Sequence, residues 1–174
     1  MSKKHPVVAI TGSSGAGTST VKDACEHIFF RQEITPLVVE GDSFHSLDRA
    51  AFKVAVAEND EKGNNSFSHF GPEANHFDKI AETFESYGKT GSCKRRYYIH
   101  SDEEALFHNE RLGGTTYTAG EFTPWEDITE KTDLLFYEGL HGGVADGDID
   151  VSKFVDLLIG VVPIVNLEWI QKIF

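Results

Sequence analysis

The chain has 174 residues, 40% of them hydrophobic and 25% charged, which is typical of one soluble globular domain. Its formal net charge of −12 argues against nucleic acid or an anionic membrane surface as a partner, because each of these is bound through a basic face. A small phosphorylated substrate is still compatible with this charge, provided that its site gathers cations locally.

Location and redox state are predicted from the same inspection. No stretch approaches the length of a membrane span, and the segment 1–12 holds a four-residue apolar run that is too short for a signal peptide. Cys25 and Cys93 lie far apart without C-x-x-C spacing, which predicts reduced thiols. We therefore expect a cytoplasmic protein.

Short apolar runs without alternation predict strands that are buried on both faces, as in a parallel sheet. These runs are 6–11, 36–40, 133–139 and 154–163. Between the first two runs a helix is predicted from apolar residues at helical spacing. These residues are Val21, Ala24, Cys25 and Ile28. Strand, glycine-rich loop, helix and strand together predict a right-handed βαβ unit.

The middle of the chain is less regular. The segment 46–63 predicts a helix ended by Gly63, and 71–91 predicts a turn followed by a second helix before Gly88. The apolar face of that second helix consists of Ile80, Phe84 and Tyr87. Further along, 94–105 predicts a strand, 112–128 turns and loops, and 166–174 the start of another helix.

The segment "AITGSSGAGTST" is almost a phosphate-binding loop. The pattern G-x-x-x-x-G-K-[ST] fits Gly12, Gly17 and Ser19, but Thr18 stands in the lysine position. Because the loop follows a strand and opens a helix, we favour phosphate binding over a plain glycine-rich turn. The predicted ATP-binding residues are Gly12, Ser13, Ser14, Gly15, Ala16, Gly17, Thr18, Ser19 and Thr20.

A second group of residues begins in "VVEGDSFH". Asp42 follows the end of a predicted strand, where open α/β sheets place their ligands. His45, Arg49 and Lys53 follow at intervals that would place three cations on one helix face. The pattern indicates a base with clamps for a phosphorylated hydroxyl compound; a helix cap followed by a solvated face is the alternative.

Two more segments carry candidate groups. In "LLFYEGLHG", Glu138 ends an apolar run at a position typical of a Walker-B acid, which would hold Mg²⁺ together with the Ser19 hydroxyl. In "KRRYYIH", two of the five arginines of the chain, Arg95 and Arg96, stand side by side. They indicate either a phosphate-docking element or a solvent-facing strand with basic flanks.

Together these segments resemble the phosphoribulokinase family in its bacterial form. The motifs are "TGSSGAGTST", "EGDSFH" with Arg49, "FSHFGPEAN", "YYIH", "LLFYEGLHG" and "IGVVPIVNLEWIQKI", in the family's order over nearly the whole chain. The resemblance implies an α/β, P-loop NTPase-like fold with a mostly parallel sheet flanked by helices. It also implies that Thr in the lysine position is a trait of the bacterial subgroup.

The resemblance further implies a reaction and roles for individual residues. ATP and D-ribulose 5-phosphate would give ADP and ribulose 1,5-bisphosphate, with Mg²⁺ as cofactor. Asp42 resembles the base for the C1 hydroxyl, and Glu138 resembles the metal-associated acid. Residues that resemble or neighbour the sugar-phosphate site are His45, Arg49, Lys53, Tyr98, His100 and Lys172.

Members of the family continue for about another hundred residues, through a basic, arginine-bearing segment that covers the site. We therefore expect 1–174 to be the N-terminal part of a kinase domain that forms homo-oligomers at full length. Three alternatives remain open at this point. They are a related P-loop kinase acting on uridine or pantothenate, a nucleotide-binding module without catalysis, and an unstable fragment.

Overall fold

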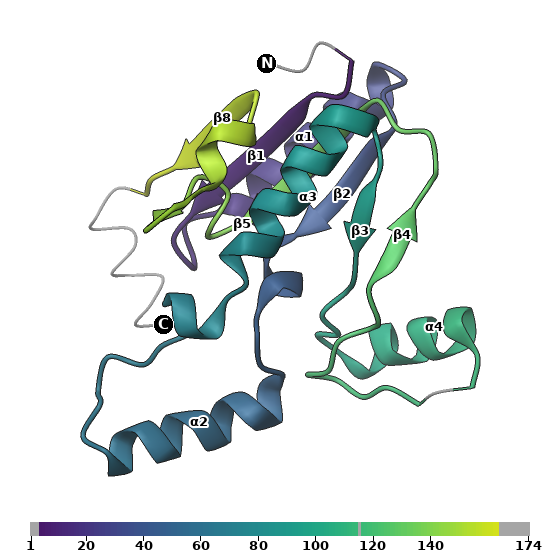
Figure 1. Ribbon diagram of the computed structural model, residues 1–174. Coiled ribbons are helices and arrows are strands. Elements are labelled where there is room, and N and C mark those ends of the chain that lie inside the picture. The colour runs from purple at the N-terminus through teal and green to yellow at the C-terminus, as the bar shows by residue number, and fades with distance from the viewer. Residues whose placement is uncertain (1–3, 115, 164–174) are drawn as a thin grey trace.

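The central sheet consists of four parallel strands in the order β2-β5-β1-β8 (Figure 1). The structure, a computed structural model, describes residues 4–114 and 116–163. The strands are β1 (Val7–Gly12), β2 (Pro36–Glu40), β5 (Leu134–Gly139) and β8 (Leu157–Val161). Three of them lie within predicted runs, and β1 extends one residue past the run 6–11 to Gly12, so the predicted parallel sheet is confirmed.

The register of the sheet determines which groups meet at its functional edge. Glu40 of β2 is paired with Glu138 of β5, and Gly12 of β1 is paired with Val161 of β8. The carboxyl ends of all four strands therefore reach the same edge. This is the edge at which parallel α/β sheets bind ligands.

Helix α1 (Thr18–Arg31) packs on one face of the sheet through Val21, Cys25 and Phe29. The predicted helix is confirmed, but the predicted face was partly wrong. Ala24 and Ile28 are exposed, because the i, i+4, i+8 row that contains Phe29 turns them away from the sheet.

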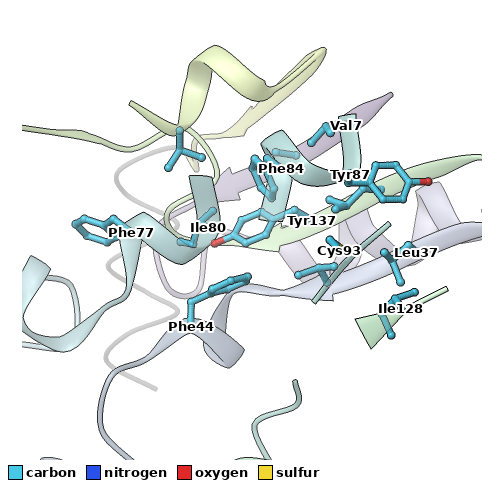
Figure 2. Close-up of a cluster of buried hydrophobic side chains, with 14 residues drawn as sticks. Val7, Leu37, Phe44, Phe77, Ile80, Phe84, Tyr87, Cys93, Ile128 and Tyr137 are labelled. Atoms are coloured by element: carbon cyan, nitrogen blue, oxygen red, sulfur yellow. The ribbon is translucent and has the colours of Figure 1, made fainter. Parts of the chain in front are cut away.

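Helix α3 (Phe77–Thr90) covers the opposite face (Figure 1). Ile80, Phe84 and Tyr87 are fully buried, as the periodicity predicts, and Figure 2 shows them packed around Tyr137 of β5. The helix runs past Gly88 to Thr90 and ends at Gly91, whose φ of 76° is left-handed. The domain is thus a three-layer α/β structure.

Helix α2 (Arg49–Glu61) confirms the predicted helix before Gly63. The Asp48 side chain caps it by accepting a hydrogen bond from the Ala51 N–H at 2.7 Å. None of its residues is fully buried, and Figure 1 shows it projecting away from the sheet.

The segment 94–105 does not form the predicted strand. Only β3 (Cys93–Arg95) is extended, paired antiparallel with β4 (Glu126–Ile128) from the predicted loop region. Helix α4 (Asp102–Leu112) then begins, because the Ser101 hydroxyl accepts a hydrogen bond from the Glu104 N–H. The remaining elements are β6 (Ala145–Asp146), β7 (Ile149–Asp150), and the 3₁₀ turns η1 (Gly41–Phe44), η2 (Pro72–Ala74) and η3 (Val151–Phe154).

Three further expectations concern the rest of the chain. The helix expected over 166–174 lies outside the described residues. Over the described ranges, no helix is long and apolar enough to cross a membrane. Cys25 and Cys93 are free thiols, and burial raises the pKa of Cys93 to about 11, which makes it a poor nucleophile.

Candidate active site

The glycine-rich loop connects β1 to the N-terminus of α1. Gly15 and Gly17 have φ values of 79° and 94°, which a residue with a side chain adopts only with strain. At Gly12, an added Cβ would lie 2.7 Å from the carbonyl oxygen of Val161. The loop can therefore curl as a phosphate loop does and present backbone N–H groups at a helix N-terminus.

A cavity of about 580 Å³ opens beside this loop at the carboxyl edge of the sheet. Its walls come from the loop, from the segments after β2 and β5, and from the stretch around Tyr98. Its lining residues are Gly12, Ser13, Ser14, Gly15, Thr18, Ser19, Lys22, Glu40, Gly41, Asp42, His45, His69, Phe70, Tyr98, His100, Glu138, Gly139, Leu140 and His141.

The cavity brings together most of the residues predicted from sequence, from four separate segments of the chain. Among the predicted residues, those outside the lining are Ala16, Gly17, Thr20, Arg49 and Lys53. Lys172 lies outside the described residues. Predicted groups of the glycine loop and predicted groups of the sugar-phosphate site thus share one cavity.

Asp42 and His45 form a pair within this cavity. Nε2 of His45 lies 3.5 Å from Oδ1 of Asp42, and Nδ1 of His45 lies 2.9 Å from Oδ1 of Asn75. The hydrogen bond to His45 lowers the pKa of Asp42, against the opposing effect of burial. Burial acts to lower the pKa of His45, but the hydrogen bond and charge of Asp42 outweigh it, so this pKa is raised.

The prediction that one helix carries His45, Arg49 and Lys53 was wrong. His45 follows the turn η1 in an extended conformation, and α2 starts only at Arg49, after the Asp48 cap. An isolated bridge between His45 and Asn75 holds the histidine backbone against the neighbouring segment instead. His45 therefore faces the cavity without belonging to the helix, while Lys53 is exposed.

Arg49 stands beside the cavity through contacts with two of its lining residues. Its Nε donates a hydrogen bond to the Tyr98 hydroxyl at 3.2 Å, and its Nη2 lies 3.5 Å from the carbonyl oxygen of His100. Its backbone N–H also donates to the carbonyl of Gly120 at 2.9 Å. These contacts hold the start of α2 against the Tyr98–His100 segment, which carries residues of the predicted sugar-phosphate site.

Arg96 fits neither interpretation of the "KRRYYIH" cluster. Its Nε donates to the carbonyl oxygen of Ser43 at 2.6 Å, and its Nη2 donates to that of His45 at 2.5 Å. The guanidinium lies over the rings of Phe122 and Trp125, and burial lowers its pKa to about 10. Arg96 thus clamps the turn that carries Asp42 and is not free to dock a phosphate.

Arg95 is likewise used within the fold. Its Nη1 donates to the carbonyl oxygen of Val38 at 3.2 Å, and its guanidinium lies 4.7 Å from the Tyr97 ring centroid. Arg95 therefore connects β3 to β2, and Arg96 connects the residue after β3 to the turn that follows β2, so the cluster matches neither the phosphate-docking element nor the solvent-facing strand.

Sequence inspection missed several residues of the cavity, among them Lys22 and Glu40. Nζ of Lys22 lies 3.3 Å from Oε1 of Glu40, and Oε2 of Glu40 lies 3.9 Å from Nε2 of His100. Burial acts to lower the pKa of Lys22, but Glu40, and then Glu26 and Glu138, outweigh it and raise this pKa. Lys22 could have been identified from its position in the sequence, one helical turn beyond Thr18.

Two histidines of the cavity were also missed. His141 is 9% exposed, its ring packs 4.7 Å from that of Phe77, and burial lowers its pKa to about 4, so it is neutral near pH 7. The His69 ring stacks on Phe52 with centroids 3.4 Å apart. His69 belongs to the "FSHFGPEAN" motif, which was noted in the sequence without any role for this side chain.

The chemistry of the lining fits a magnesium–nucleotide complex. Ser19 offers a hydroxyl and Glu138 a carboxylate, and both line the cavity. No group of three or more His, Cys, Asp or Glu that could enclose a metal occurs among the residues that the structure describes. The Ser19 hydroxyl and the Glu138 carboxylate suit Mg²⁺, which in kinases is held by one or two protein ligands with waters and substrate phosphates.

A β-strand, glycine loop and helix at the edge of a parallel sheet define a P-loop NTPase-like α/β protein. Residues 7–174 match the model of the phosphoribulokinase / uridine kinase family. The chain belongs to this family.

Among its relatives are a phosphoribulokinase of Nitrobacter vulgaris, 47% identical over 173 residues, and the chromosomal phosphoribulokinase of Cupriavidus necator, 50% identical over 174 residues. These alignments cover 99% and 100% of this chain but 57% of each relative. The chain therefore spans little more than half the length of these relatives.

Solved structures agree with the family. A phosphoribulokinase from Rhodobacter spheroides superposes with a TM-score of 0.82 at 41% identity, covering 99% of this chain and 56% of that one. A possible uridine kinase from Bacillus stearothermophilus superposes with a TM-score of 0.62 at 13% identity, covering 98% of this chain and 78% of that one, and supports the fold alone.

Proposed function

We propose that this chain is the nucleotide- and acceptor-binding part of a phosphoribulokinase. The reaction is transfer of the γ-phosphoryl group of ATP to the C1 hydroxyl of D-ribulose 5-phosphate, which gives ADP and ribulose 1,5-bisphosphate for carbon dioxide fixation in the Calvin cycle. The observation that carries the proposal is that one cavity is lined by the glycine loop, by Asp42 and by His45, Tyr98 and His100.

The loop side of the cavity binds ATP in this proposal. Backbone N–H groups of the loop and the N-terminus of α1 hold the phosphates. Ser19 and Glu138 would hold Mg²⁺, which when bound neutralises charge on the phosphates. The γ-phosphoryl group then points along the sheet edge toward Asp42.

The acceptor side binds the sugar phosphate. Asp42 accepts the proton of the attacking hydroxyl at its carboxylate, and its lowered pKa keeps it ionised and able to do so near pH 7. His45 and Arg49 hold the phosphate of the sugar, with Tyr98, His100, Lys53 and Lys172 as neighbours. Because phosphoryl transfer depends mainly on positioning and electrostatics, this set of groups suits the reaction.

An assay of ADP release tests the proposal directly. The protein is given ATP and Mg²⁺ with ribulose 5-phosphate, uridine or pantothenate in parallel. We expect release with ribulose 5-phosphate alone, measured on a version of the chain that is extended with the C-terminal part of a relative. Release with uridine or pantothenate instead would assign the chain to another kinase of the same family. The proposed cytoplasmic location rests on the sequence inspection above. The proposed homo-oligomer rests on the family resemblance, and size-exclusion chromatography of the purified protein tests it.

A nucleotide-binding module without catalysis is the second candidate. Both candidates share the glycine loop and the cavity beside it, which would bind ATP in either case. ATP affinity and turnover measured on one preparation separate the two candidates. A module would bind ATP without releasing ADP in the presence of ribulose 5-phosphate.

A further inference from the structure

The phosphate loop of this chain lacks the cation that such loops ordinarily carry. Thr18 stands in the lysine position, and its Cγ2 lies only 2.9 Å from where a Cβ on Gly12 would be. The Thr18 side chain is therefore packed toward the loop backbone. Some other group has to balance the charge of the phosphates that the proposed function places here.

Lys22 is the one lysine or arginine among the described residues that line the cavity. The other lining side chains that can carry positive charge are histidines, and His141 is neutral near pH 7. The lining also includes three carboxylates, those of Glu40, Asp42 and Glu138. A tri- or tetra-anionic nucleotide entering this cavity would thus meet one permanent side-chain cation.

Helix geometry brings this cation toward the loop. Lys22 lies four residues after Thr18, so both are on the same face of α1, about 6 Å apart along the axis. Side chains of a helix tilt toward its N-terminus, and a lysine is long enough to span one turn. The Lys22 ammonium can therefore approach the position that a lysine at 18 would occupy.

The acidic partners of Lys22 place it near the reacting end of the nucleotide. Its Nζ lies 3.3 Å from Glu40, which is paired across the sheet with Glu138, the proposed metal-associated acid. With 20% of the side chain exposed, the ammonium is partly withdrawn from water, where its charge acts more strongly than on the open surface.

We propose that Lys22 supplies the positive charge for the β- and γ-phosphates of ATP that the loop lacks at Thr18. This inference rests on the proposed function in so far as it requires ATP to bind along the loop. Glu40 then holds the lysine in place before the nucleotide binds, and the ammonium turns to the phosphates when the nucleotide enters.

The competing explanation is that the Lys22–Glu40 ion pair only fastens α1 to β2. A part-exposed pair of this kind contributes little to stability. The two explanations differ in what they predict for ATP relative to ADP. A charge directed at the γ-phosphate favours ATP over ADP, whereas a fastening ion pair affects the two nucleotides equally.

The test compares Kd values for Mg·ATP and Mg·ADP by isothermal titration calorimetry. The variants are Lys22→Met, Lys22→Arg, Glu40→Gln and, as a matched control for charge, Lys89→Met. Lys89 forms a more exposed ion pair with Glu85 on α3, outside the cavity, and its replacement removes the same charge. Each variant is made in the 174-residue chain and in a version extended with the C-terminal part of a relative, and its folding is checked by thermal melting.

We expect Lys22→Met to raise the Kd for Mg·ATP about tenfold or more, because one charge-assisted hydrogen bond is lost. The Kd for Mg·ADP should rise much less. Lys22→Arg should retain most of the affinity. Glu40→Gln, which breaks the same ion pair but keeps the lysine, should leave the ATP-to-ADP preference unchanged, as should Lys89→Met.

The preference is the ratio of the Kd for Mg·ADP to the Kd for Mg·ATP. The inference would be overturned if this ratio in folded Lys22→Met stayed within twofold of the parent's ratio. It would also be overturned if Glu40→Gln lowered the ratio as much as Lys22→Met does. A different result would contradict the proposed reaction. An extended version of the parent that binds ATP but does not phosphorylate ribulose 5-phosphate would contradict the reaction and leave the Lys22 result standing. A folded parent that binds neither nucleotide would overturn both.

Discussion

Nε2 of His45 lies 3.5 Å from Oδ1 of Asp42, and this contact couples the proposed base to a proposed phosphate-binding residue. The carboxylate favours the charged imidazolium, and the imidazolium favours the carboxylate. In the proposed reaction, His45 therefore has two functions. It keeps Asp42 ionised, and it presents positive charge to the sugar phosphate.

Replacing the proposed base tests its role directly. Asp42→Asn preserves the size of the side chain but cannot accept the hydroxyl proton, so we expect phosphoryl transfer to fall by about 10² to 10⁴. The melting temperature should change little, because the Asp42 side chain is 56% exposed. Kinetics are measured on the extended version of the chain, with the exposed Asp146 changed to Asn as control. Activity of Asp42→Asn within about threefold of the parent would remove Asp42 from the mechanism.

The Asp42–His45 pair also predicts a dependence of stability on pH. Asp42 has a lowered pKa, so its contribution is present above the ordinary value of 3.8 and is lost as pH falls through the lowered pKa. His45 has a raised pKa, so its contribution is complete below the ordinary value of 6.5 and is lost as pH rises through the raised pKa. The pair is therefore strongest from about pH 4 to 6.5.

The measurement is a series of thermal melts from pH 5 to pH 9 on the parent and His45→Gln. We expect the parent's advantage to be largest near pH 5 to 6, at no more than about 1 kcal/mol for a part-exposed pair, and to shrink by pH 9. The exposed His27, changed to Gln, serves as control and should show no such trend. An advantage that grows with pH would contradict the assigned direction for His45.

Arg96 is expected to act on catalysis through the turn that it clamps. Arg96→Gln removes hydrogen bonds to the carbonyl oxygens of Ser43 and His45, and we expect a loss of about 1–3 kcal/mol in stability. The turn also carries Asp42, and a displacement of about 1 Å can cost some 10²-fold in rate. We therefore expect kcat to fall even under conditions where the variant is fully folded.

Arg111 provides the matched control for this arginine. It forms a part-exposed ion pair with Glu126, with Nη1 and Oε2 2.8 Å apart, away from the cavity. Arg111→Gln should cost less than about 1 kcal/mol and leave kcat unchanged. Equal kinetic effects of the two substitutions would show that Arg96 does not position the turn.

The sheet could be predicted from sequence, whereas the hydrogen bonds by which Arg96 holds the turn that carries Asp42 could not. Non-alternating apolar runs identify strands buried on both faces, and the face of α3 follows from the spacing of Ile80, Phe84 and Tyr87. The partners of Arg96 depend on the path of a segment more than fifty residues away, which no local pattern encodes. Helix α4 was predictable from Ser101 and Glu104, a capping-box pattern hidden by treating 94–105 as one strand.

Arg49 is expected to act on the sugar phosphate and not on ATP. It contacts Tyr98 and His100 on the acceptor side, and it does not line the part of the cavity beside the glycine loop. Arg49→Ala should raise the KM for ribulose 5-phosphate far more than the KM for ATP in steady-state assays. Equal increases in the two KM values would contradict this division of the cavity.

The final prediction compares the 174-residue chain with the version extended by the C-terminal part of a relative. Strand β8 is at the edge of the sheet in the described part of the chain, and it carries Leu157 at 54% and Leu158 at 44% exposure. Edge strands and exposed apolar side chains of this kind are stabilised when further structure covers them.

We expect the extended version to melt at a higher temperature and more cooperatively, and to bind less of the dye ANS. We also expect the 174-residue chain to bind Mg·ATP weakly and to turn over ribulose 5-phosphate slowly or not at all. The basic segment implied by the family resemblance would add charge to the transferring phosphoryl group, an effect worth about 10³ to 10⁵ in rate. A coupled ADP-release assay on both proteins measures this difference. Near-equal turnover would show that residues 1–174 suffice for the reaction, because the loop, Asp42 and Lys22 would then supply all the charge and positioning that it needs.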